Sequence, residues 1–451
     1  YQTATVESAL AHFDAASTLY GKLGDRSSQA RMEARATAAL GTLRRRVEAI
    51  ERISEAWTAF ADLGPDDANL LAVGRTYAGI LLSTGENERA TEMADSVLGG
   101  AERLGLPAVA AEALSALGTA AFYGGRLWQA RTLLEGARRI ADDANLNDAA
   151  FRVMSMLPSV IALDDPRGAL TVEREAIARA RRVGYRTGEI SIIFNAVEDA
   201  RRVGDWDWAE TELAVVGQLD IDESSLVGNL SQQTFFAAYH GTLEAATIAD
   251  LARRIEPLED RDLSSGIADI EATLAHSQGR WADAAHRWLT IRAVSPLNAP
   301  YALPKAGRAA VLAGDAGLAQ EALDGLAAIG ARGRAMDADR ATIRAGLAVL
   351  SGDTGTARSG YRTAMAGYRD LGLAWDEALA GLEAAWMLGT GDAELAGWAD
   401  TARATFGRLG AAPMITLLDA AIARGSVGSS ADGTGAAPAS AAAERSAVRE
   451  A

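Results

Sequence analysis

Cysteine is absent from the 451 residues, and this absence excludes disulfide bonds and thiolate metal ligands. Histidine is scarce, and four imidazoles spread along the chain leave little capacity for a metal site. The histidines are His12, His240, His276 and His286. Proline occurs only 10 times, so long helices can run without interruption. The lack of cysteine favours a cytoplasmic location.

Positive charge is also in short supply. Lys22 and Lys305 are the only lysines, arginine supplies the rest, and the formal net charge is −16. An acidic surface repels phosphate, so a nucleic-acid partner is not expected. The apolar run from Leu70 to Leu82 is interrupted by Arg75, and no run approaches the ~18 residues of a membrane span. The sequence therefore predicts no membrane partner.

Alanine is abundant, and it recurs with glycine in a pattern that repeats along the chain. A glycine or similar turn residue is followed by a polar residue, often by Trp or Leu, and then by alanine five positions after the glycine. The clearest copies are Gly85–Ala90, Gly125–Ala130, Gly204–Ala209, Gly279–Ala284, Gly314–Ala319, Gly352–Ala357 and Gly391–Ala396; weaker copies are Asp164–Ala169 and Gly241–Ala246. Together with Ala9 and Ala49, which extend the register towards the N-terminus, these alanines recur every 35 to 41 residues, which is a repeat period.

A second signal, an apolar residue followed by glycine, falls between these copies. It occurs at Gly24, Gly64, Gly105, Gly184, Gly330, Gly372 and Gly410. Glycine ends helices because it adopts the left-handed conformation at low cost. Each repeat therefore contains two turns and two helices.

The residues around each turn fit this unit. Asp205, Asp315, Asp353 and Asp392 are candidate helix N-caps. Trp128, Trp206 and Trp281 are expected to cover the seam between two helices, with Ala130, Ala209 and Ala284 at their closest approach, where a larger side chain would overpack.

Stacked units of this kind bury a continuous core. We predict an all-α, tetratricopeptide-like α-solenoid superhelix of about ten long helix-turn-helix repeats over residues 1–425. The segment 426–451, rich in Gly, Ser and Ala, is expected to be a disordered tail.

Four segments together resemble the C-terminal tetratricopeptide region of large bacterial signalling ATPases. They are Gly204–Ala209, Asp164–Ala169, Pro296–Pro300 and Ala402–Pro413. Such proteins place an AAA- or STAND-type ATPase before the repeats, many with an adenylate/guanylate cyclase domain. Relatives of the LuxR type carry a DNA-binding domain after the repeats, and none follows Gly425 here. The resemblance implies a cyclase–ATPase parent, with ATP and Mg²⁺ bound only by upstream domains, and the start at Tyr1 suggests a piece of a longer chain.

Catalytic and metal-binding motifs are missing. Neither lysine follows a glycine-rich loop, and no GxSxG or HExxH motif occurs. His276 and His286 flank one turn, and we interpret both as ordinary surface residues rather than metal ligands. No catalytic residue, metal or cofactor is therefore assigned to this chain.

The first helix of each pair faces the inside of a tetratricopeptide superhelix, so polar residues there are the candidate binding residues. Asn and Gln can both donate to and accept from a peptide backbone. The candidates are Arg75, Arg152, Asn195, Glu198, Asn229, Gln232 and Gln233.

Two functions of different classes remain open. The first is a regulatory scaffold that binds a protein, a peptide or a small inducer in its groove and couples this event to an attached ATPase or cyclase. The second is a stand-alone small-molecule-binding solenoid, which needs a polar pocket with titratable groups, and no such cluster is visible in the sequence. The repeat region of a LuxR-type regulator is a further alternative.

Overall fold

The computed structural model describes residues 2–43, 45–256, 261–295, 298–330 and 332–429. These residues form α-helices and one short 3-10 helix, and they contain no β-strand. The helices are α1 (Gln2–Leu23), α2 (Arg26–Thr42), α3 (Arg46–Ala59), η1 (Ala61–Leu63), α4 (Ala68–Ser83), α5 (Asn87–Leu104), α6 (Pro107–Tyr123), α7 (Leu127–Asp143), α8 (Asn147–Met154), α9 (Leu157–Ala162), α10 (Pro166–Val183), α11 (Arg186–Val203), α12 (Trp206–Gly217), α13 (Glu223–His240), α14 (Ala245–Ile255), α15 (Arg261–Ser277), α16 (Trp281–Val294), α17 (Ala299–Leu312), α18 (Ala316–Ala328), α19 (Arg334–Leu350), α20 (Thr354–Leu371), α21 (Ala374–Leu388), α22 (Ala393–Arg408) and α23 (Ala412–Ser429).

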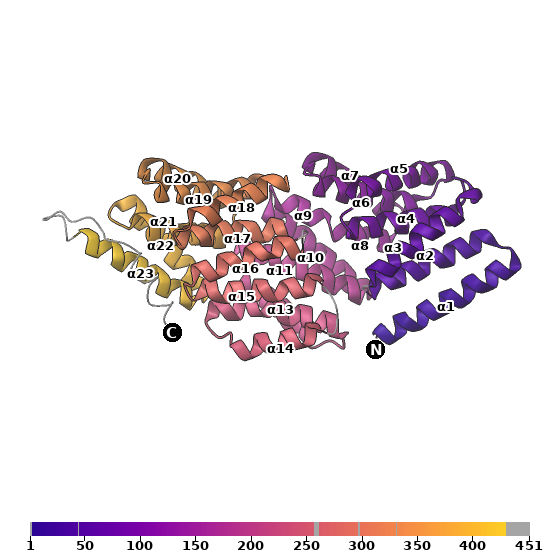
Figure 1. The fold of residues 1–451 in the computed structure, drawn as a ribbon, viewed down its shortest axis with the longest axis horizontal. Helices are drawn as coiled ribbons and strands as arrows, with labels where there is room; N and C mark the ends of the chain where they lie inside the picture. Colours follow the sequence, from indigo (N-terminus) through magenta and orange to yellow (C-terminus); the bar gives the residue numbers. More distant parts are fainter. Residues whose placement is uncertain (1, 44, 257–260, 296–297, 331, 430–451) are drawn as a thin grey trace, which may run out of the picture.

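Consecutive helices pack side by side along the whole chain, from α1 at one end of the elongated molecule to α23 at the other (Figure 1). The prediction of an all-α solenoid is confirmed. The backbone stays helical to Ser429, and the rest of the expected tail, 430–451, lies outside the described residues. No helix among the described residues is long and apolar enough to cross a membrane.

The turns form as the glycine pattern predicts. The seven glycines of the second signal all have positive φ, as Gly105 does at the end of α5 with φ 62°. The side chains of Asp315, Asp353 and Asp392 cap the helices that follow them. Asp205 does not cap α12, because its carboxylate instead accepts a hydrogen bond from Arg174 at 2.5 Å.

The repeated alanines lie where the helices approach each other. Ala130, Ala209 and Ala284 are completely buried, as predicted. Ala246, from a weak copy, is exposed, and Ile248 is buried two residues later. The backbone contacts that define the repeat therefore depend on small residues at regular positions.

The tryptophans of the turns divide into two groups. Trp206 and Trp281 are buried, whereas Trp128 is 87% exposed, so the expectation that Trp128 covers a seam is wrong. Trp206 and Trp281 precede their alanine by three residues, but Trp128 precedes Ala130 by two. One residue rotates a side chain by about 100° around the helix axis, which turns Trp128 away from the seam.

Segments about 170 to 200 residues apart also touch, because one turn of the superhelix closes against the next. The backbone N–H of Ala335 donates to the carbonyl of Leu163 at 3.0 Å. The guanidinium of Arg408 donates to the carbonyl of Gly204 at 2.8 Å. Helices α11 and α21, and α13 and α23, are in direct contact. The sequence pattern did not predict this closure.

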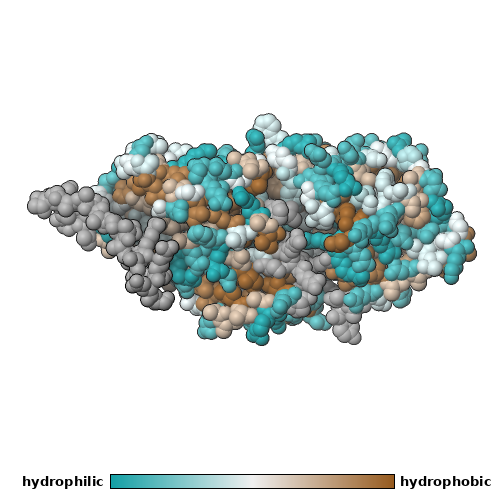
Figure 2. All heavy atoms as spheres, in the orientation of Figure 1, coloured by the Kyte–Doolittle hydropathy of each residue, from teal (hydrophilic) through white to brown (hydrophobic). Residues whose placement is uncertain are grey.

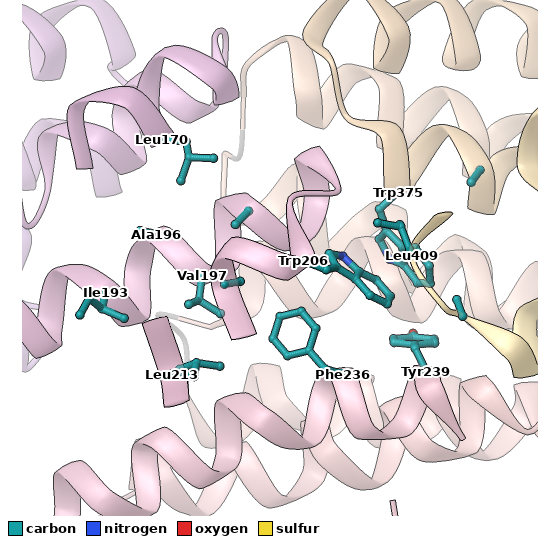
Figure 3. Close-up of a cluster of buried hydrophobic side chains, with 14 of the residues drawn as sticks. Leu170, Ile193, Ala196, Val197, Trp206, Leu213, Phe236, Tyr239, Trp375 and Leu409 are labelled. Atoms are coloured by element: carbon teal, nitrogen blue, oxygen red, sulfur yellow. The ribbon is translucent and has the colours of Figure 1, made fainter. Parts of the chain in front are cut away.

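An aromatic cluster fills the junction between the two turns (Figure 3). The ring centroids of Trp206 and Trp375 are 4.8 Å apart, although α12 and α21 belong to different turns. Phe236 and Tyr239 of α13 complete the cluster, and the indole N–H of Trp206 donates to the carbonyl of Arg201 at 3.0 Å. The aromatic side chains thus join the two turns through one continuous core.

We expect Trp206→Ala to lower the free energy of unfolding by about 3–5 kcal/mol, since it removes a buried aromatic side chain. Trp128→Ala is the matched control, and its exposed indole predicts a change within about 0.5 kcal/mol. Urea denaturation followed by circular dichroism measures both. Equal effects of the two substitutions would contradict the assignment of Trp206 to the junction.

Candidate functional site: a charged chamber inside the superhelix

Two adjoining cavities lie inside the superhelix. Their volumes are about 340 Å³ and 120 Å³. Glu198, Arg201 and Arg202 of α11 and Tyr301 and Lys305 of α17 line both of them. We call this combined space the chamber. Helices of both superhelical turns contribute to its wall, so the chamber exists because the turns close on each other.

Four cations in the chamber wall are each held by an acidic partner. Arg202 donates to Asp376 at 2.8 Å and to Asp339 at 3.4 Å. Arg308 donates to Glu383 at 2.6 Å. The partners of Arg202 lie on α19 and α21, so these ion pairs cross from one superhelical turn to the next.

The other two cations, Arg201 and Lys305, have their partners within the same superhelical turn. Arg201 donates to Glu198 at 2.8 Å and to the backbone carbonyl of Gln232 at 2.6 Å. Lys305 donates to Asp269 at 3.3 Å. Each cation is thereby fixed in position, as is required of a preformed polar site.

The neighbouring charged groups determine the protonation states of the side chains in the chamber wall. Burial acts to lower the pKa of Arg308, but the carboxylates of Glu383 and Asp376 outweigh it and raise the pKa. Burial and the nearby cations Arg308 and Lys305 lower the pKa of His276 to about 3, so this imidazole is neutral at pH 7. It forms a hydrogen bond of 3.0 Å with the hydroxyl group of Tyr239.

Two carboxyl groups in the wall of the larger cavity, those of Glu173 and Asp199, have raised pKa values. Glu173 is 1% exposed, and its Oε2 atom has no hydrogen-bond partner among the described residues. Burial and the charge of Asp199 raise its pKa to about 10. Burial likewise raises the pKa of Asp199. Glu173 therefore keeps its proton at neutral pH.

Aromatic rings form the apolar part of the wall. Phe235, Tyr239, Trp288 and Trp375 line the smaller cavity. The guanidinium of Arg201 lies 4.3 Å from the centroid of the Phe235 ring, which is a cation–π distance. The chamber thus combines charged groups, neutral hydrogen-bonding groups and aromatic surface. The face of the molecule seen in Figure 2 carries hydrophilic residues interspersed with several hydrophobic patches.

Three of the candidate binding residues lie in the chamber wall: Asn195, Glu198 and Gln232. The side-chain amide of Asn195 donates to the carbonyl of Ser155 at 3.1 Å. Asn195 and Glu198 lie on α11 and Gln232 lies on α13, the first helices of their pairs, but the wall also includes residues of second helices, such as Glu173 of α10.

The other four candidates lie elsewhere. Asn229 is 1% exposed, and its amide, like that of Gln233, lies near Gly217 of α12 rather than in the chamber wall. One turn of helix separates the two residues, so the face they share is packed against a neighbouring helix. Arg75 of α4 donates to Glu112 at 2.7 Å, and Arg152 lies 3.7 Å from the same carboxylate.

The absence of a titratable cluster, inferred from the sequence, is wrong. The charged residues of the chamber lie on six helices, α10, α11, α15, α17, α19 and α21, and the closure of the superhelix brings these distant segments together. One local signal existed. Lys305 and Arg308 are the only charged residues of α17, whose other side chains are mostly apolar. A charge inside an apolar helix indicates a buried ion pair or a binding site.

The interpretation of His276 as a surface residue is wrong. His276 is buried and bonded to Tyr239, whereas His286 is exposed and bonds the carbonyl of Ala282. Across the described ranges, no three His, Asp or Glu residues are arranged to hold a metal ion.

Comparisons with known proteins give no family assignment. No family model and no curated protein matches the chain. Among solved structures, a Rap protein complexed with Competence and Sporulation Factor is 12% identical, with 82% of this chain and 99% of that chain covered and a TM-score of 0.44. A monomeric mutant of IFIT1 with Gppp-AAAA is 12% identical to this chain. The match covers 84% of this chain and 90% of that chain, with a TM-score of 0.44. The P58(IPK) TPR domain is 14% identical over 83% and 98%, with a TM-score of 0.25. No function is transferred from these structures.

The raised pKa of Glu173 predicts a pH dependence of stability. The unfolded chain ionises this carboxyl above about pH 4.5, whereas the folded chain keeps its proton to about pH 10. Folding therefore takes up a proton, and stability falls as the pH rises from about 5 to about 9, by up to about 1.4 kcal/mol per pH unit. Glu173→Gln should remove this part of the slope. Urea denaturation at several pH values tests it, and parallel curves for both proteins would contradict the assignment.

The ion pair between Arg308 and Glu383 predicts a double-mutant result. Both side chains are buried, so Arg308→Met should cost about 3–5 kcal/mol by leaving a carboxylate without its partner. The double variant Arg308→Met, Glu383→Met should recover part of this loss, because no unpaired charge stays behind. Additive losses in chemical denaturation would show that the two side chains act independently.

Proposed function

We propose that the chain is a ligand-binding regulatory scaffold that holds a small polar ligand, or the end of a peptide, in the chamber. The observation that carries this proposal is the clustering of four cations and their acidic partners around a concave space where two superhelical turns meet. Ligand pockets in proteins are concave sites with a few fixed polar groups among apolar ones, and the chamber has this composition.

The size of the chamber limits its occupant. The larger cavity measures about 340 Å³, at the lower end of the range for small-molecule sites. A folded protein domain does not fit in this volume. A metabolite, an amino acid or a few residues of an extended peptide does.

The same residues that face the chamber also hold the superhelix closed. Arg202 lines both cavities and pairs with Asp339 and Asp376 of the next turn. A ligand that competes for Arg202, or that adds contacts across the chamber, changes the balance between closed and open turns. Binding is thereby coupled to the shape of the whole repeat array, which is the requirement for a sensor module.

We further propose that this change of shape is passed to an attached ATPase or cyclase in a larger cytoplasmic signalling protein, as the family resemblance implies. The alternatives are the repeat region of a LuxR-type regulator and a stand-alone small-molecule-binding protein. The chamber supports the stand-alone alternative as well, since it supplies the pocket with titratable groups that this function requires. A ligand-dependent change in an attached enzyme's rate distinguishes coupling from simple binding.

Filling the chamber tests where the ligand binds. Gly266 of α15 lines the larger cavity, and a Cβ atom added there meets nothing within 4 Å. Gly266→Phe should therefore fill the cavity without disturbing the backbone. Gly397 of α22 has equally open surroundings outside the chamber, so Gly397→Phe is the matched control.

The readout is the shift in Tm caused by a panel of trialanine, putrescine, glutarate and adenosine monophosphate. We expect at least one compound to raise the Tm of the wild type and of Gly397→Phe by several degrees, and to have no effect on Gly266→Phe. A compound that stabilises all three proteins equally, or a panel without any binder, would count against a ligand site in the chamber.

A further inference from the structure

The carboxyl pair formed by Glu173 and Asp199 is not used by the ion-pair network of the chamber. Glu173 lies on α10 and Asp199 on the neighbouring helix α11, and both line the larger cavity. Glu173 is almost completely buried, and its Oε2 atom has no partner among the described residues. A buried polar atom without a hydrogen bond is unfavourable and requires an explanation.

The cations that line the same cavity as this carboxyl pair form their hydrogen bonds with other acceptors. Three cations line the larger cavity within the described part of the chain, and they are Arg201, Arg202 and Lys305. Arg202 interacts electrostatically with Asp199, but its hydrogen bonds go to Asp376 and Asp339.

Arg201 and Lys305 are likewise committed to other acceptors. Arg201 donates to Glu198 and to the carbonyl of Gln232, and Lys305 donates to Asp269. Among the described residues, Glu173 Oε2 therefore has no donor, and the buried Nε of Arg201 likewise has no acceptor.

We propose that the Glu173–Asp199 pair is the subsite that receives a cationic group of the ligand, a primary ammonium or a guanidinium on an aliphatic stem. This inference rests on the proposed function and specifies the ligand class. An ammonium group carries three donors and no acceptor, which complements two carboxyl groups. Phe194, Ile270 and Ile291 line the same cavity and supply apolar surface for the stem.

Binding of a cation changes the protonation of the carboxyl pair, so a released proton identifies this binding mode. In the empty chamber burial raises the pKa of both carboxyls. The charged and titratable groups that line the same cavity are Glu198, Arg201 and Arg202 of α11, Asp269 of α15, and Tyr301 and Lys305 of α17. A bound cation stabilises the ionised pair, so its entry at pH 7.5 releases a proton from the carboxyl groups. A neutral ligand releases none.

Calorimetry with pentylamine and its neutral counterpart pentanol tests the proposal at pH 7.5. We expect pentylamine to bind at least tenfold more tightly than pentanol and to release a proton, seen as a dependence of the binding heat on the ionisation enthalpy of the buffer. Glu173→Gln and Asp199→Asn should each weaken pentylamine binding at least tenfold and reduce the proton release. Circular dichroism checks that both variants are folded. Equal affinity for pentylamine and pentanol, or unchanged binding by both variants, would overturn the proposal.

A matched control and the chamber-filling variant separate the possible failures. Glu175 lies on the same helix, but its side chain is 63% exposed, so Glu175→Gln should bind pentylamine as the wild type does. If Gly266→Phe blocks pentylamine while Glu173→Gln and Asp199→Asn do not, the chamber binds ligand but the carboxyl pair is not the cation subsite. If pentylamine binds unchanged to Gly266→Phe, its site is outside the chamber, and both proposals fail.

Discussion

The contact between successive superhelical turns is the constraint on which the rest of this structure depends. Without it, the repeats would form an open coil whose inner face is a groove. With it, α11 and α12 pack against α21 and α22, and Trp206 and Trp375 share one aromatic core. The ion pairs of Arg202 with Asp339 and Asp376 cross the same boundary. A local repeat pattern thereby produces a concave interior space lined by both superhelical turns.

This closure gives the charged residues two roles. Buried ion pairs contribute little net stability compared with apolar packing, because desolvation of the charges offsets their attraction. Their retention in the chamber wall is therefore better explained by position than by stability. They connect the two turns, and they present oriented donors and acceptors to the chamber. In the proposed function, a ligand in the chamber acts on the contacts that hold the superhelix closed.

The local architecture could be predicted from the sequence, because local rules determine it. Glycine needs only its own backbone preference to end α5 at Gly105, and Ala130, Ala209 and Ala284 recur because helices approach closely there. Trp128 shows where the repeat pattern alone misleads. It lies one residue closer to its alanine than Trp206 and Trp281 do, and its side chain is therefore on the surface and not in the seam between helices.

The chamber could not be predicted in the same way. Arg202 and Asp376 are 174 residues apart, and no periodic signal records that two superhelical turns meet at this point. The pitch of the superhelix depends on small rotations between every pair of neighbouring helices, and these accumulate over many repeats. Asn195, Glu198 and Gln232 could be placed on the inner helices from the sequence, and the two charges of α17 gave a local signal for Lys305 and Arg308, whereas the contribution of Asp339 is visible only in the three-dimensional structure.

The most direct test of this account measures whether the turns are closed in solution. The chain has no native cysteine, so spin labels at Arg167→Cys and Asp370→Cys occupy unique positions. Both residues are exposed, and the Arg167 guanidinium packs against Gly372 across the junction. Pulsed electron paramagnetic resonance should give one short, narrow distance distribution, and Trp206→Ala should broaden it and shift it to longer distances. A long, broad distribution in the otherwise unsubstituted protein would show an open superhelix and contradict the existence of the chamber.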